Sequence, residues 1–480
     1  MNLSFPQSIS RVISTFVFYA LLLVIALTAI PYGTVQPWWK AVFQCAVFLL
    51  AALSVIGLFI SSDRRREKYR FWRRVFWPVF AFLAFALLQT VSLPSFLHSG
   101  IDQRTTISAD VFTTQQWIVQ VLALSLVSWL VVTHANSAKR RQRVIDVVIA
   151  IGAASAFFGL LRQTFQRSLG FVLPDLRAGY GYAQFINANH FAFLMELALA
   201  LALGMVVCGG VKKRRAAIYI LAALPMWLAI VLSGSRGGIL SLLCQVLLLA
   251  FLFSLWRSAP AREERPASFS NRVRRAGSTF LVRGVLVIGV LTAAVTTVVL
   301  VGGDPLAGRV DSLAVELDRN VADVYTLRPN IWRASWALVK DHPVAGVGFG
   351  GYWIAITKYH VGSGETTPQE AHNDYLELLA SGGVIGVILG LWLIVQLFRA
   401  AKSKLSELSG QVRDPDTSFE RAATLAALIG MLTVAVHSLV DFGLHITVNA
   451  VVFAVLMAIV CVRAEAGDQE AGAWAGHERH

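Results

Sequence analysis

A succession of apolar blocks, each long enough to cross a membrane, constrains this chain more than any other feature. The blocks run for roughly 18 to 23 residues, and a spanning helix needs about 20. Charged residues make up only 15% of the 480 residues, whereas soluble domains carry about a quarter. The sequence therefore predicts an all-α polytopic membrane protein with about twelve transmembrane helices. The predicted spans are residues 12–30, 39–60, 75–93, 115–133, 144–162, 191–209, 216–233, 238–256, 284–302, 383–399, 422–440 and 446–463.

Basic loops between these blocks predict how the chain is oriented. Loops on the cytoplasmic side of a membrane are enriched in Lys and Arg. All the strongly basic segments fall on one side when the spans are counted, so we expect both termini in the cytoplasm and the protein in a bacterial inner membrane. This distribution explains the net charge of +14 without nucleic-acid binding. The basic segments lie at about residues 64–74, 139–143, 212–215, 257–283 and 399–421.

The opposite, periplasmic side has one large segment, about residues 303–382, between the ninth and tenth predicted spans. It is rich in aromatic residues, so we expect short helices packed against the bundle rather than a linker. Residues 343–351 contain four glycines in nine positions and predict a tight loop. We treat residues 1–463 as a single transmembrane domain and residues 464–480 as a polar cytoplasmic tail.

The four cysteines are predicted to be free residues of the membrane helices. Cys45, Cys208, Cys244 and Cys461 lie in or at the ends of apolar blocks, which predicts neither a disulfide nor a metal cluster. The first apolar block is too long for a signal-peptide core, so we expect it to remain as the first membrane helix.

Arg236 stands between two apolar blocks with almost no loop, in the sequence Ser233-Gly-Ser-Arg-Gly-Gly238. A charge at this depth is costly to desolvate unless it meets a partner. One interpretation is an arginine at a helix end that reaches into the interface. The other is a guanidinium that binds a lipid-borne anion, with the small neighbours admitting a bulky head group.

His372 precedes the tenth predicted span, beside Asn373. One interpretation is an interfacial capping group. The other is a general base, because a histidine titrates near neutrality and can remove a proton from a sugar hydroxyl. Arg309, Arg328 and Arg333 lie in the same outward segment, and guanidinium groups bind phosphate oxygens in forked pairs.

Five motifs, in order along the chain, resemble those of the O-antigen ligases and their polymerase relatives. Together they extend from Phe185 to the last span, whereas the first 180 residues carry no motif that we recognise. The motifs are Phe185-Ile-Asn-Ala-Asn-His190; Ser235-Arg-Gly-Gly238; Arg328-Pro-Asn-Ile-Trp332 with Asp341-His-Pro343 and Gly346-Val-Gly348; His372-Asn373 with Gly383 and Gly386; and His437-Ser-Leu-Val-Asp-Phe442.

This resemblance implies a reaction. A glycan on undecaprenyl pyrophosphate would be transferred to a hydroxyl of the lipid A core or of a growing glycan, without a metal ion or other cofactor. By carry-over His372 matches the general base, and Arg236 and Arg328 match the diphosphate-binding arginines; Arg309 is a weaker match, and Arg333 is an alternative to Arg328. The chemistry agrees, because a diphosphate leaving group needs charge stabilisation rather than a strong acid. No set of His, Asp or Glu metal ligands is evident on the outward face.

Several alternatives remain open at this point. Ligation to lipid A core is the leading interpretation, repeat-unit polymerisation is the second, and a polar-solute transporter is the rival from another class. For the enzyme, Arg236, Arg328 and His372 should converge on one cavity, on the face opposite the basic segments. His437 and Asp441 are one helical turn apart and could pair, while Glu196 has no partner that the sequence identifies.

Overall fold

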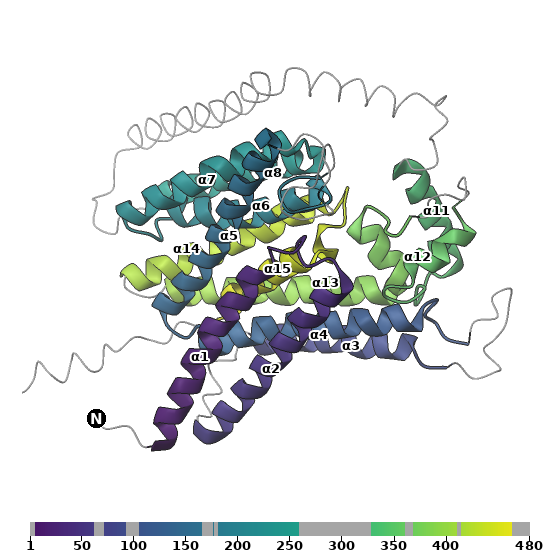
Figure 1. The fold of residues 1–480 in the computed structure, drawn as a ribbon, viewed down its shortest axis with the longest axis horizontal. Coiled ribbons are helices and arrows are strands. Elements are labelled where there is room, and N and C mark those ends of the chain that lie inside the picture. The colour runs from purple at the N-terminus through teal and green to yellow at the C-terminus, as the bar shows by residue number, and fades with distance from the viewer. Residues whose placement is uncertain are drawn as a thin grey trace, which may run out of the picture.

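The computed structural model describes residues 5–61, 72–92, 105–165, 176, 181–258, 328–360, 368–409 and 414–462, which form an all-helical bundle (Figure 1). The helices of this part are α1 (Phe5–Leu27), α2 (Pro37–Ser61), α3 (Trp72–Gln89), α4 (Val111–His134), α5 (Ala138–Phe165), α6 (Ala188–Val207), α7 (Lys213–Ser233), α8 (Arg236–Ser258), α11 (Arg328–Asp341), α12 (Tyr352–Ala355), η4 (Ile356–Lys358), α13 (Asp374–Ser409), α14 (Pro415–His437), η5 (Gly443–His445) and α15 (Thr447–Cys461).

Eight helices within the described ranges are long and apolar enough to cross a membrane, namely α1, α2, α4, α5, α6, α7, α13 and α14. Shorter apolar stretches occur in α8 and α15, and α3 lies where the third span was predicted. The prediction of an all-α polytopic membrane protein is confirmed. The predicted span 284–302 and all of the predicted periplasmic segment before Arg328 lie outside the described residues.

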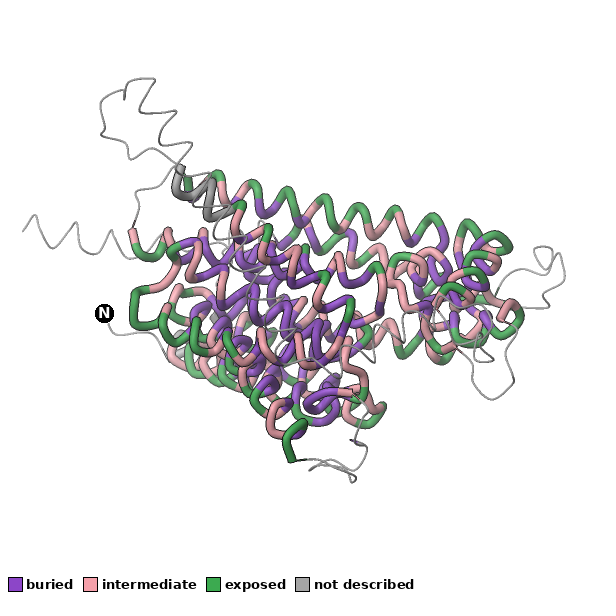
Figure 2. The backbone as a smooth tube through the Cα atoms, turned by 90° about the horizontal axis from the view of Figure 1, so that it is seen from above, coloured by how far each residue is buried: buried purple, intermediate pink, exposed green. Residues whose placement is uncertain are grey.

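α6 lies at the centre of the bundle and packs against α5, α7, α8, α14 and α15. Beyond its first turn it is apolar on all sides except at Glu196, and 83% of its membrane window is buried. Gly204 allows close packing there, because a Cβ at this position would come within 2.6 Å of the Cβ of Ala426 on α14. Figure 2 shows the same distribution, with buried residues in the middle and exposed residues along the outer helices.

The two ends of the bundle carry different segments of the chain. α6 ends and α7 begins at the end where α14 starts, and Gly210 packs there against Ala422. The other end carries the starts of α6, α8 and α13 together with α11 and α12 (Figure 1). Lys212–Arg215 therefore lie opposite His372, as the alternation of basic loops predicts. We call these the basic end and the site end.

A buried ion cluster ties three helices together at the basic end. Glu420 of α14 contacts the Arg141 guanidinium of α5 through one carboxylate oxygen, and its other oxygen lies 3.0 Å from Lys404 Nζ of α13. The three side chains are at most 4% exposed. Lys404 also donates to the carbonyl of Ile459 on α15, and Arg141 donates to that of Ala135. Each charge thus has a partner, which burial in a membrane protein requires.

Replacement of Glu420 should destabilise the bundle strongly. Glu420→Ala leaves two buried cations uncompensated, and removing one member of such a cluster costs about 3–5 kcal/mol. Arg215→Ala is the control, because Arg215 forms only an exposed 3.7 Å pair with Asp146 and should cost less than about 1 kcal/mol. Thermal unfolding of the purified variants in detergent measures both, and equal midpoints for the two variants would contradict the assignment.

Candidate active site

A strained three-residue turn presents His372 at the site end. Its φ of 51° is left-handed, a conformation that His adopts more readily than most residues. Asn373 supplies the cap of α13, since its Oδ1 accepts hydrogen bonds from two backbone N–H groups of the first turn, each at 3.0 Å. The flanking Ala371 is fixed through its N–H to Glu377 and through its carbonyl to the Trp332 indole. The capping role thus belongs to Asn373, and the His372 ring is left to other partners.

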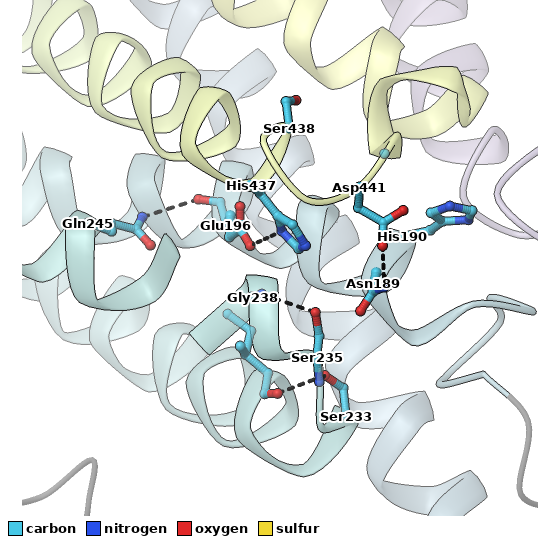
Figure 3. A network of polar contacts seen from close by, with 12 residues as sticks. Asn189, His190, Glu196, Ser233, Ser235, Gly238, Gln245, His437, Ser438 and Asp441 are labelled. Carbon is cyan, nitrogen blue, oxygen red and sulfur yellow. Dashed lines mark hydrogen bonds and ion pairs between the residues drawn. The ribbon is translucent and has the colours of Figure 1, made fainter. Parts of the chain in front are cut away.

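One buried carboxylate, Asp441, joins residues from four separate segments. Its Oδ1 lies 3.6 Å from His372 Nδ1 and accepts a 2.9 Å hydrogen bond from the Phe442 N–H. Its Oδ2 lies 3.0 Å from Arg328 Nη2 and also accepts from the Asn189 amide. The Asp441 side chain is 0% exposed. Figure 3 shows it beside Asn189, at the start of α6.

These contacts keep Asp441 charged. Burial alone would raise the pKa of this carboxyl, but the contact with His372, the Phe442 N–H and the Arg328 charge together lower the pKa to about 2. The carboxylate is therefore ionised at neutral pH. The His372 contact, at 3.6 Å, is longer than a hydrogen bond.

The three predicted arginines of the outward segment differ in placement. Arg328 is the first residue of α11, followed by Pro329 in the first turn, where proline is tolerated. Its side chain is 38% exposed, so donors beyond those facing Asp441 remain accessible. Arg333 is exposed and donates to Asn330 on its own helix, apart from the Asp441 contacts. Arg309 lies outside the described residues.

Arg236 begins α8 after a turn of only two residues. Gly234 ends α7 in the left-handed conformation with φ of 67°, and Ser235 caps α8 because its Oγ accepts from the Gly238 N–H at 3.0 Å. The exposed Arg236 side chain thus extends from a helix N-terminus, where the unpaired N–H groups also favour anions.

The Arg236 turn packs against the segment that leads to Asp441. A Cβ at Gly237 would lie 2.4 Å from His437 Nε2 and 3.0 Å from Val440. The expected pairing of His437 with Asp441 is wrong. His437 Nδ1 instead contacts Glu196 Oε1 at 2.7 Å (Figure 3). The Asp441 N–H still bonds the His437 carbonyl at 3.2 Å, one helical turn away, but the Asp441 carboxylate is taken up by Arg328, Asn189 and the Phe442 N–H.

The glycine loop of residues 343–351 supports the site from behind, and its predicted tight conformation is confirmed. α13 is interrupted at Gly383, whose φ is 60°. The freed carbonyls of Ala380 and Ser381 accept hydrogen bonds from the Val347 and Gly348 N–H groups. Gln89, which the sequence analysis missed, is fully buried and links the glycine loop to α13. Its amide donates to the carbonyls of Ala345 and Ser381 and accepts from the Phe349 N–H.

A second charged cluster lies next to the contacts of Asp441. It corrects the expectation that the outward face has no set of metal ligands. Ligand atoms of Glu370, Glu377 and His445 lie within 4.8 Å of one another and could hold a cation. His445 Nδ1 is 3.2 Å from Glu370, and its Nε2 is 3.6 Å from Glu377 and 3.7 Å from Asp374. The sequence could have indicated only Glu370 and Glu377 as members of this cluster, because they lie close to His372 along the chain.

The geometry of this cluster favours a proton over a metal ion. Burial opposes protonation of His445, but Glu370 and Glu377 raise its pKa well above the ordinary value. An imidazole with both nitrogens directed at carboxylates is doubly protonated and has no lone pair for a metal. The Phe442 ring separates His445 from His372, with centroids 5.8 Å and 4.8 Å away.

A groove within the described ranges lies far from these residues. It is at the basic end, roughly 40 Å from His372 by the helical rise along α13. It is lined by Arg74, Gln396, Arg399, Lys402, Ser403, Ser406 and Glu407.

Comparison with known proteins agrees with the motifs. Residues 221–391 match the family model described as O-antigen ligase. This region runs from α7 into α13 and includes Arg236, Arg328 and His372. A search of curated proteins finds no match. The matched region lies in an all-helical, multi-pass membrane protein, and over this region the chain is similar to the O-antigen ligase family.

Proposed function

We propose that the protein transfers a glycan from undecaprenyl pyrophosphate to an acceptor hydroxyl at the periplasmic face of the bacterial inner membrane, without a metal ion. The observation that carries this proposal is the shared contact of His372 and Arg328 with Asp441. A base and a phosphate-binding cation are thereby held by one buried group. The basic end, with Lys212–Arg215, then faces the cytoplasm together with both termini.

His372 acts as the general base. The acceptor oxygen forms a bond to the anomeric carbon of the glycan while the bond from that carbon to the diphosphate breaks. The acceptor proton passes to His372, and the electron pair of the broken bond stays on the undecaprenyl diphosphate. Because Nδ1 faces Asp441, Nε2 is the nitrogen that receives the proton. The carboxylate then stabilises the imidazolium that forms.

Arg328 and Arg236 bind the diphosphate of the donor. Arg328 is oriented by Asp441 and keeps exposed N–H groups for the substrate. Arg236 adds a second guanidinium at the N-terminus of α8, and both stabilise the charge that develops on the leaving oxygen. The site uses helix ends at one face, whereas a transporter places its site near the midplane between broken helices. This placement favours transfer over transport.

Lipid A core is the acceptor that we propose first, because the matching family model is described as a ligase. Incubation of the purified protein with a lipid-linked glycan tests this directly. A ligase attaches the glycan to added lipid A core, whereas a polymerase extends the glycan when the donor is supplied alone. Failure to form either product, together with solute uptake into vesicles, would replace the proposal with transport.

His372→Ala should lower turnover by roughly 10²–10⁴-fold while binding of undecaprenyl diphosphate is retained. The proton that His372 removes belongs to the acceptor, so the donor contacts are unaffected. His360→Ala, at a histidine of the same end that takes no part in the Asp441 contacts described above, is the matched control. Product formation and carrier affinity are measured on both variants, and full activity of His372→Ala would remove the histidine from the mechanism.

The two arginines of α11 should behave differently. Arg328→Ala should weaken carrier binding and turnover together, because the diphosphate is charged in both the ground state and the transition state. Arg328→Lys should restore only part of the loss, since a point charge replaces a fork. Arg333→Ala should stay near the wild type, because this side chain contacts Asn330 on its own helix. The proposal would be revised if Arg333→Ala caused the larger loss in the same assay.

Activity should survive removal of divalent cations. Excess chelator is expected to leave the rate of transfer unchanged, because guanidinium groups supply the positive charge and His445 is held as an imidazolium. The rate is compared with and without chelator and after addition of magnesium. Loss in chelator, with recovery in magnesium, would instead assign a metal to Glu370, Glu377 and His445.

A further inference from the structure

We infer that Glu196 and His437 are positioning residues, a buried pair that holds the Arg236 turn in place at the donor site. The inference rests on the proposed function, because Arg236 acts there on the donor diphosphate. Neither side chain is exposed, so neither touches the substrate. Their role is to fix the backbone position from which the Arg236 side chain extends.

The contact between His437 and the Arg236 turn is direct. The Nε2 and Cδ2 atoms of the His437 ring occupy the space where any side chain at position 237 would lie, 2.4 Å and 2.5 Å from an added Cβ. Only glycine permits this approach. The first turn of α8 therefore rests on the edge of the imidazole, one residue from Arg236.

The opposite edge of the ring is held by Glu196. The His437 Nδ1 to Glu196 Oε1 distance is 2.7 Å, and the backbone carbonyl of Glu196 accepts a 3.1 Å hydrogen bond from Gln245. Gly237, Ser241 and Gln245 are spaced four residues apart, so they share one face of α8. α6 thus contacts α8 at Gln245 directly and at Gly237 through the imidazole.

One face of the His437 ring is covered as well. The Phe193 ring stacks on it with a centroid distance of 4.1 Å and an interplanar angle of 24°. Phe193 in turn packs against Gly443, which follows the Asp441 segment. The imidazole therefore has one orientation, and it links the Arg236 turn to the segment that holds His372 and Arg328.

A polar pair at this depth is costly unless it has a purpose. An apolar residue at 437 could fill the space, but it would not fix the direction of the contact. A hydrogen bond to an ionisable partner in low-dielectric surroundings is short and directional. The Nε2 edge also faces the positive end of the α8 dipole, which matches a ring that gives its Nδ1 proton to Glu196.

The test compares Gly237→Ala, His437→Ala and Glu196→Gln, each alone and combined with Arg236→Ala. Undecaprenyl diphosphate is the binding probe, and KM and kcat for the lipid-linked donor are measured beside it. Each single change should weaken carrier binding roughly tenfold, the coupling expected within one network. In the Arg236→Ala background the same changes should add little, because the guanidinium that they position is gone.

Ser128→Ala is the matched control, since Ser128 is also buried and bonds the Ala454 carbonyl, on helices away from this turn. It should leave carrier affinity unchanged. Gly237→Ala retains both Glu196 and His437 in the chain and disturbs their contact with α8, so it decides the question if His437→Ala does not fold. Full additivity with Arg236→Ala, or unchanged affinity in Gly237→Ala, would overturn the inference. If Arg236→Ala itself leaves carrier affinity unchanged, the proposed function fails instead.

Discussion

The site end of this protein depends on one buried negative charge. Removal of the Asp441 carboxylate from water costs several kcal/mol unless charges and hydrogen bonds replace the lost solvent. The structure supplies them from α6, α11, the turn before α13 and its own backbone. Segments that are distant in the sequence therefore converge because each satisfies part of the same group. The arrangement of His372 and Arg328 follows from that requirement.

Irregular backbone is confined to places where protein covers it. Within a bilayer every backbone N–H and C=O needs a partner, and a regular helix provides one. α13 departs from this rule at Gly383, and there Gln89 and the loop of residues 343–351 take over the freed carbonyls. The turn between α7 and α8 is closed in the same way by Ser235. Both breaks lie toward the site end. The irregular backbone is therefore found where the side chains of the site have to be oriented.

Sequence reasoning recovered much of this organisation. Long apolar blocks and basic loops were enough to predict the helical class and the placement of Lys212–Arg215 opposite His372. Both features can be recognised within a short stretch of the sequence. The motifs also led to Arg328 and His372, which share Asp441. The partners of His437, Gln89 and His445 were not accessible in this way. Each depends on how neighbouring helices are rotated about their axes, and hydrophobic periodicity alone does not specify that rotation.

Position 372 carries two demands at once. Its backbone is left-handed, with φ of 51°, and its side chain must reach the buried carboxylate of Asp441. Glycine, asparagine and aspartate tolerate that backbone, but none offers an imidazole. Glutamate or lysine could accept a proton, but each would strain the turn by about 1 kcal/mol or more and shift the group away from its partner. The left-handed backbone at position 372 therefore restricts which other base could replace His372, whatever the reactivity of that base.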